Sequence, residues 1–150
     1  GNLFQDKRFD YIYHLGEYSR VEQSFDDYQF VISNNIGPLS RILEYSSKTR
    51  SKLIYSGSST KFADIGASSS PYSWSKAVNA EHIVNYARWF DLKFAICYFY
   101  NAYGGNEISE GKYSTVIAKY CKLKDEGVKL LPVTKPGTQR RNFTHIESLT

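Results

Sequence analysis

The sequence predicts an α/β fold in which parallel strands alternate with helices. Short apolar runs alternate along the chain with longer segments in which apolar residues recur at helical spacing. Nearly continuous apolar strands are typical of a parallel sheet that is covered on both faces. Small and polar residues follow each apolar run, and sheets of this kind bind ligands at the carboxyl ends of their strands. We therefore expect a functional site along that edge.

The first part of the chain supplies two expected strands and two expected helices. The apolar runs at 9–15 and 52–56 predict buried strands, and the spacing of apolar residues predicts helices over 24–46 and 72–90. Residues 60–71 contain Gly and Pro and are expected to form a loop.

Pro38 lies inside the first of these helical segments. A proline has no N–H to donate and crowds the carbonyl four residues earlier, which here belongs to Asn34. We expect this helix to be irregular at Asn34.

The second part of the chain continues the alternation. Residues 93–98 predict a third strand, 101–112 a loop, 113–126 a helix and 129–133 a further strand. Gly127 directly follows the helical segment, where a glycine commonly ends a helix in the left-handed conformation.

Composition limits the classes of partner. The chain has 150 residues, of which 41% are hydrophobic, and this suits one domain or one domain with the edge of another. A formal charge of +4, spread over scattered Lys and Arg, predicts no nucleic-acid partner. Its cysteines and histidines lack metal-ligand spacing, so we expect no metal. No apolar run approaches the ~20 residues that span a bilayer, so we expect no membrane partner and a cytoplasmic location.

Three side chains predict proton transfer. Tyr72 and Lys76 are four residues apart and share one face of the expected helix. A lysine ammonium beside a phenol favours the phenolate, so Lys76 is expected to lower the pKa of Tyr72 and make it a general base or acid. Ser58, at the end of an apolar strand, could hold a reacting hydroxyl or carbonyl. The alternative is an exposed helix whose tyrosine packs and whose lysine is solvated.

Six segments of the chain follow one another in a familiar order. They are H-L-G-E-Y-S-R-V at 14–21, N-N-I-G at 34–37, S-G-S-S-T at 56–60, Y-S-W-S-K at 72–76, F-Y-N-A-Y-G at 99–104 and R-N-F-T-H-I at 141–146. They are similar to H-L-A-A-x-S-x-V, N-x-x-G, S-S-S, Y-x-x-x-K, F-N-x-Y-G and R-D-F-x-H-V. In this the chain resembles the extended short-chain dehydrogenase/reductase family, in particular its NAD-dependent nucleotide-sugar epimerases and dehydratases, of which UDP-glucose 4-epimerase is an example.

The resemblance implies a role for each matching residue. It implies a catalytic group of Ser58, Tyr72 and Lys76, with no metal. It implies cofactor contacts from Leu15, Gly16, Ser19, Asn34, Ser56, Tyr72, Lys76 and Phe99. It implies substrate contacts from Ser58, Asn101 and Arg141, of which the arginine would meet a phosphate.

The resemblance also implies a Rossmann-like, doubly wound parallel sheet of which this chain is an internal part. The glycine-rich turn G-x-x-G-x-x-G of such folds has no match in these 150 residues. We therefore expect 1–112 to be the C-terminal part of a dinucleotide-binding domain that lacks its glycine-rich unit. Residues 113–150 would begin the substrate-binding region. Whether this segment is active alone is left open.

The function implied by the resemblance is NAD-dependent epimerisation of a nucleotide sugar, with a UDP-sugar as the expected substrate. Dehydratases of the family carry Asp-Glu where this chain has Ser59 and Thr60, which favours an epimerase. Two alternatives remain: a dehydratase, decarboxylase or reductase of the same fold, or a non-catalytic fragment of a dinucleotide fold. The resemblance further implies a homodimer through the helices near 25–47 and 72–90. NAD is expected, although the residue that distinguishes it from NADP lies outside the sequence.

Simpler explanations exist for several of these residues. Arg141 could be one of two solvated arginines on a loop, and Asn101 could cap a turn. Asn34 could be an ordinary polar helix residue, and Ser19 could be only an N-cap.

Overall fold

The computed structural model describes residues 7–62 and 66–149. The chain divides into two compact units, Gly1–Phe99 and Tyr100–Thr150. The sequence analysis placed a boundary later, between residues 112 and 113. Its assignment of the two parts to cofactor binding and substrate binding stays a prediction. The two units are described separately below.

A parallel sheet of three strands organises the first unit. The strands lie in the order β1-β2-β3, and Ile12 pairs with Leu53, which pairs in turn with Phe94. This confirms the parallel sheet and the three strands expected near 9–15, 52–56 and 93–98. The observed bounds are Tyr11–His14 for β1, Lys52–Ser58 for β2 and Phe94–Phe99 for β3.

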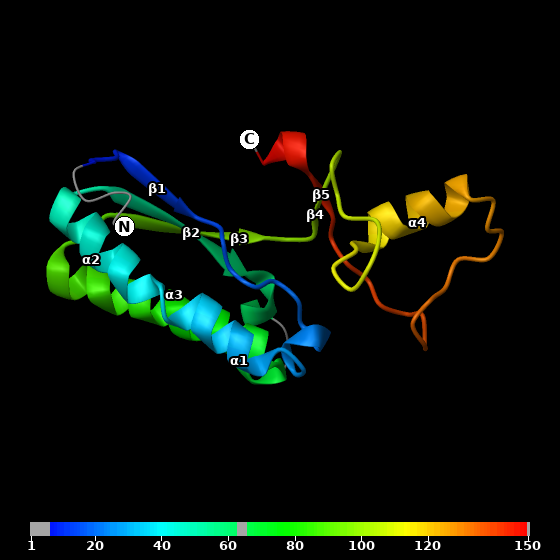
Figure 1. Cartoon of the computed structure of the whole chain (residues 1–150), viewed down its shortest axis with the longest axis horizontal. Helices are drawn as coiled ribbons and strands as arrows, with labels where there is room; N and C mark the ends of the chain where they lie inside the picture. Colours follow the sequence, from blue (N-terminus) through cyan, green and yellow to red (C-terminus); the bar gives the residue numbers. More distant parts are fainter. Residues whose placement is uncertain (1–6, 63–65, 150) are drawn as a thin grey trace. The chain divides into compact units, whose positions relative to one another are not determined.

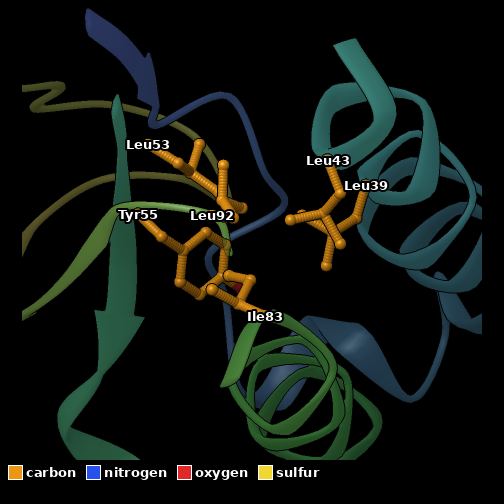
Figure 2. Packing of buried hydrophobic residues seen from close by; sticks show 6 residues of the cluster. All are labelled: Leu39, Leu43, Leu53, Tyr55, Ile83 and Leu92. Carbon is orange, nitrogen blue, oxygen red and sulfur yellow. The ribbon is translucent and has the colours of Figure 1, made fainter. Parts of the chain in front are cut away.

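Three helices lie together on one face of this sheet (Figure 1). They are α1 (Tyr28–Val31), α2 (Leu39–Thr49) and α3 (Pro71–Phe90). Apolar side chains from α2, α3 and β2 meet between the helices and the sheet (Figure 2). This core consists of Leu39, Leu43, Leu53, Tyr55, Ile83 and Leu92.

In the described part of this unit, helices cover one face of the sheet (Figure 1), and the other face carries exposed aromatic side chains. Tyr11 and Tyr13 in β1 are 48% and 66% exposed. The alternation of side chains along a strand places these two residues on the same face. The expected burial of the first strand is therefore incorrect, because α2 and α3 pack against the opposite face.

The expected helix over 24–46 is interrupted. A π-helical turn spans Ile32–Ile36, and α2 begins at Leu39, directly after Pro38. This confirms the irregularity expected at Asn34. The physical reason is that Pro38 cannot donate an N–H to the carbonyl one turn before it.

The start of α3 is fixed by its sequence. Ser70 is the N-cap, and its Oγ accepts a hydrogen bond of 3.0 Å from the N–H of Ser73. Pro71 occupies the first helical position, where no N–H is needed. The expected loop over 60–71 contains two short 3₁₀ turns, Ser59–Phe62 and Gly66–Ser69, and residues 63–65 lie outside the described residues. This cap places Tyr72 in the first turn of α3.

The second unit contains one helix and two short strands. Helix α4 spans Val116–Asp125, within the expected 113–126, and Gly127 follows with φ +77°, as expected for a left-handed residue. Strands β4 (Ala102–Tyr103) and β5 (Thr144–His145) pair in parallel. The predicted strand over 129–133 is wrong, because this segment pairs with no strand among the described residues and Leu130 is 87% exposed.

Candidate active site

Ser58 and Tyr72 come together where β2 ends and α3 begins. The Tyr72 hydroxyl donates a hydrogen bond of 3.1 Å to Oγ of Ser58. Both side chains are largely buried, with 7% and 9% of their surface exposed. Ser58 also lies 2.9 Å from the hydroxyl of Thr60 and accepts from its backbone N–H at 3.3 Å. The two oxygens that the sequence suggested for proton transfer are therefore in direct contact.

Lys76 lies one turn further along α3 and is buried. Its Nζ donates to Oε2 of Glu17 at 2.6 Å and to Oγ of Ser56 at 3.3 Å. The ammonium also lies 4.5 Å from the centroid of the Tyr55 ring, within the range of a cation–π contact. Lys76 is thus held mainly by a carboxylate.

The expectation that Lys76 lowers the pKa of Tyr72 is wrong for this structure. Burial raises the pKa of Tyr72 above its ordinary value, because the phenolate would lose its hydration. The hydrogen bond with Ser58 and the charge of Arg20 act against this rise, and the charge of Glu17 adds to it. Because the pKa of Tyr72 lies above its ordinary value, the phenol is the favoured form of Tyr72 at neutral pH.

Glu17 lies in this cluster, although the sequence analysis assigned it no role. Its two oxygens accept from Tyr55 OH at 2.8 Å and from Asn79 Nδ2 at 2.8 Å, besides Lys76. Nε2 of His14 lies 3.1 Å away. Burial alone would raise the pKa of Glu17, but the contacts with His14, Lys76 and Tyr55 outweigh it and hold the pKa below its ordinary value. The sequence feature that could have drawn attention to Glu17 is its acidic side chain at a position where the pattern H-L-A-A-x-S-x-V has alanine.

A second missed residue is Asn35, the neighbour of the predicted cofactor residue Asn34. Asn35 is fully buried. Its side chain accepts from the N–H of Tyr18 at 2.7 Å and donates to Oγ of Ser75 at 3.0 Å. Its carbonyl accepts from Asn79 at 2.8 Å. Asn34 is only half-buried and donates to Asn35 at 3.2 Å, so the structural anchor of this segment is Asn35.

The other predicted cofactor residues lie at or beyond the carboxyl ends of the three strands. Leu15, Gly16 and Ser19 follow β1 and are exposed. Ser56 lies in β2, beside Lys76. Phe99 ends β3, pairs in register with Ser58 and is 37% exposed.

Asn101 and Arg141, the two predicted substrate residues of the second unit, belong to segments that are far apart in the sequence but adjacent in this unit. Nδ2 of Asn101 donates to the carbonyl of Asn142 at 2.8 Å. Arg141 is exposed and its Nη1 donates to the carbonyl of Arg140 at 3.1 Å. The F-Y-N-A-Y-G and R-N-F-T-H-I segments are further joined by the pairing of β4 with β5.

Comparison with known families identifies the chain. A family model described as the NAD dependent epimerase/dehydratase family matches residues 1–149. The chain belongs to this family. The catalytic role that the sequence analysis gave to Ser58, Tyr72 and Lys76 stays a prediction.

Solved structures share the fold. Pal from Bacillus thuringiensis has a TM-score of 0.88 at 22% identity, over 99% of this chain and 50% of that one. The UDP-N-acetylglucosamine 4-epimerase from Methanobrevibacter ruminantium M1, in complex with UDP-N-acetylmuramic acid, gives 0.83 at 21% identity, over 93% and 48%. The UDP-glucuronic acid 4-epimerase from Bacillus cereus, in complex with UDP-glucuronic acid and NAD, gives 0.80 at 26% identity, over 93% and 46%. The TM-scores confirm the Rossmann-like parallel fold. This chain spans about half the length of these solved proteins.

Among residues 7–62 and 66–149, the helices are all too short or too polar to cross a bilayer.

Proposed function

We propose that the protein containing this chain epimerises a nucleotide sugar at C4 with the help of NAD. The observation that carries this proposal is the 3.1 Å contact between the hydroxyls of Ser58 and Tyr72, with Lys76 on the next turn of the same helix. Family membership and the names of solved proteins with this fold support it: several are 4-epimerases of UDP-sugars, and some were solved with NAD.

The residues at the sheet edge fit the nicotinamide ribose of such a cofactor. Ribose hydroxyls need donors and acceptors, and Tyr72, Lys76 and Ser56 supply them at the carboxyl end of β2. The backbone after β1 has room beside it, since a Cβ placed on Gly16 would meet no atom within 4 Å. We propose that Leu15, Gly16, Ser19, Asn34, Ser56, Tyr72, Lys76 and Phe99 contact NAD, as the sequence analysis suggested.

The chain's own residues would move the proton of the sugar hydroxyl. When bound at this edge of the sheet, NAD would supply a hydride acceptor for C4 and, once reduced, a hydride donor for the other face of the sugar. Tyr72 accepts the proton of the C4 hydroxyl while the sugar is oxidised to the 4-keto form, and it donates a proton when that carbonyl is reduced. Ser58 donates a hydrogen bond to the reacting oxygen and thereby keeps it close to the phenol.

The resting state of Tyr72 favours the second of these proton transfers. Because burial and Glu17 raise the pKa of Tyr72, the phenol carries its proton before any ligand binds. It is therefore prepared to donate to a carbonyl oxygen. Acting as a base requires additional positive charge near the phenol, which the cationic ring of an oxidised nicotinamide cofactor would provide.

We also propose that the second unit contributes to substrate binding. Arg141 is exposed and its guanidinium suits bidentate contact with a phosphate group. Asn101, on the F-Y-N-A-Y-G segment, offers an amide to the nucleotide sugar.

A product assay with the full-length gene product tests the function. The protein is incubated separately with UDP-glucose, UDP-N-acetylglucosamine and UDP-glucuronic acid, and the products are separated by ion-pair chromatography. We expect one substrate to give a mixture with its 4-epimer and no net change in NADH absorbance. A 4-keto-6-deoxy sugar or a decarboxylated product would overturn epimerisation in favour of another reaction of the family. The absence of any product with all three sugars and with their 4-epimers would contradict both.

We further propose a homodimer and a cytoplasmic location. Trp74, Trp89 and Phe90 on α3 are 44%, 68% and 55% exposed, and α3 lies in the 72–90 segment expected to pair with a second copy. Light scattering should give twice the monomer mass, and a Trp89→Glu variant should shift the equilibrium toward the monomer. Cys97 and Cys121 are free thiols, which is consistent with a reducing compartment.

A further inference from the structure

Glu17 is a buried carboxylate to which the proposed reaction gives no role. Only 1% of its side-chain surface is exposed. A charge at such depth is unfavourable unless it is paired and hydrogen-bonded. The position lies in the segment that follows β1, where the pattern H-L-A-A-x-S-x-V has alanine. A carboxylate at this position therefore needs a physical explanation.

The contacts of Glu17 reach three elements of the unit. Oε2 accepts from Nζ of Lys76 at 2.6 Å and from the hydroxyl of Tyr55 at 2.8 Å. Oε1 accepts from Nδ2 of Asn79 at 2.8 Å and lies 3.1 Å from Nε2 of His14. Glu17 thus connects the end of β1 with β2 and with two successive turns of α3.

These contacts restrict the ammonium of Lys76. A lysine ammonium has three N–H donors. Glu17 takes one of them and Ser56 takes a second. The position of the nitrogen is thereby fixed by two oxygens on two different elements, and one donor is left for a ligand.

We propose that Glu17 is a positioning residue for Lys76, whose carboxylate fixes the ammonium beside Ser56 and leaves one donor for a ligand hydroxyl. This assignment rests on the proposed function for the identity of that ligand, because a ribose hydroxyl is the group that the family's cofactor would present. The ion pair itself does not depend on turnover.

The charges around this ion pair determine its effect on Tyr72. The groups that face it are His14 from β1, Tyr55 from β2, Tyr72 from α3 and Arg20 from the segment after β1. Removing the charge of Glu17 leaves Lys76 buried without its carboxylate, so the pKa of Lys76 falls further. It also removes a charge that raises the pKa of Tyr72.

Amine reactivity tests the proposal in the full-length gene product without substrate. Lys76 is labelled with acetic anhydride, which reacts with the neutral amine, and quantified by peptide mass spectrometry. Glu17→Gln keeps the size of the side chain and removes its charge. We expect labelling of Lys76 to rise about tenfold for each pKa unit that the lysine loses.

The matched control is Glu44→Gln, which removes an exposed acid on α2 and should leave Lys76 labelling unchanged. Equal labelling in the wild type and in Glu17→Gln would overturn the proposal.

A double-mutant cycle keeps the proposal testable where the single variant folds poorly. Glu17→Gln, Lys76→Met and the double variant are compared by their melting temperature. An ion pair predicts that the double variant loses less than the sum of the two single losses, since no buried charge is left without its partner. If Glu17→Gln alone is unfolded, the double variant should recover a folded protein. Additive losses, or a double variant as unfolded as the single one, would contradict the pairing.

The pH profile separates positioning from a merely structural role. In Glu17→Gln, both the acidic limb, set by Tyr72, and the alkaline limb, set by Lys76, should move to lower pH. A structural role alone would lower the rate at every pH and leave the limbs in place, which would overturn the assignment. If the protein converts none of the nucleotide sugars, the proposed function fails, and the labelling and melting experiments still decide the ion pair.

Discussion

The hydroxyl oxygens of Ser58 and Tyr72 lie 3.1 Å apart, although the two residues are 14 positions apart in the sequence. One is the last residue of β2 and the other belongs to the first turn of α3. The Ser70 cap and Pro71 fix where that helix begins, and this determines which residue faces the end of the strand. The contact is therefore a consequence of how the helix starts.

Tyr72→Phe removes the hydroxyl and keeps the ring. We expect kcat to fall by about 10²- to 10⁴-fold, the usual contribution of a positioned acid or base. The melting temperature should change little, because the ring still packs. Initial rates with the converted UDP-sugar measure this, and Tyr28→Phe, on an exposed residue of α1, is the control. A rate within a factor of two of the wild type would exclude Tyr72 as the proton-transfer group.

Ser58→Ala should shift the pH dependence of the reaction. The hydrogen bond with Ser58 lowers the pKa of Tyr72, so its removal raises that pKa further. The acidic limb of the kcat profile, which requires the phenolate, is expected to move to higher pH. Ser40→Ala, an exposed hydroxyl on α2, should leave the limb unchanged. If the acidic limb of the kcat profile moves to lower pH in Ser58→Ala, the hydrogen bond from Ser58 does not lower the pKa of Tyr72.

Gly57→Ala should destabilise the sheet. A Cβ at this position would lie 2.7 Å from Cε1 of Tyr98 and 2.8 Å from Cγ2 of Ile96 on the neighbouring strand. Forcing an extra carbon into packed surroundings typically costs about 1–3 kcal/mol. Urea unfolding measures the loss. The control is Gly105→Ala, where a Cβ would meet no atom within 4 Å. An unfolding free energy equal to that of the wild type would show that these side chains move aside at no cost.

Asn35→Ala and Asn34→Ala should have different consequences. Asn35→Ala leaves the buried N–H of Tyr18 without its acceptor, and such a loss costs about 1–3 kcal/mol. Asn34→Ala should change the unfolding free energy by less than about 0.5 kcal/mol, as half-buried or surface substitutions usually do. Calorimetric titration with NAD should nevertheless show weaker binding by Asn34→Ala. Unchanged affinity would remove Asn34 from the cofactor contacts.

The periodic elements could be predicted from the sequence because their signals are local. Apolar runs marked all three strands of the sheet, and helical spacing together with Pro71 marked α3. Pro38 marked the interruption at Asn34 for the same reason, since its effect extends over a single turn. The run at 129–133 looked equally apolar. It forms no strand because a strand depends on a neighbour, which a local pattern does not reveal.

The electrostatics of the site could not be predicted, because they depend on distant pairs. Glu17 and Lys76 are 59 residues apart in the chain and meet only in the folded unit. The sequence showed Tyr72 and Lys76 on one helical face, which predicted a phenol with a lowered pKa. Burial of the phenol raises the pKa of Tyr72 instead, and the charge of Glu17 adds to this rise. Asn35 was overlooked for a similar reason, because its importance comes from Tyr18 and Ser75.

Ser58, Tyr72 and Lys76 all belong to the unit that ends at Phe99, whereas Asn101 and Arg141 belong to the unit that follows. Under the roles proposed above, the residues for proton transfer and the residues for sugar binding thus belong to different units. Substitutions after residue 99 would then alter which sugar is accepted, and substitutions before it would alter the reaction itself.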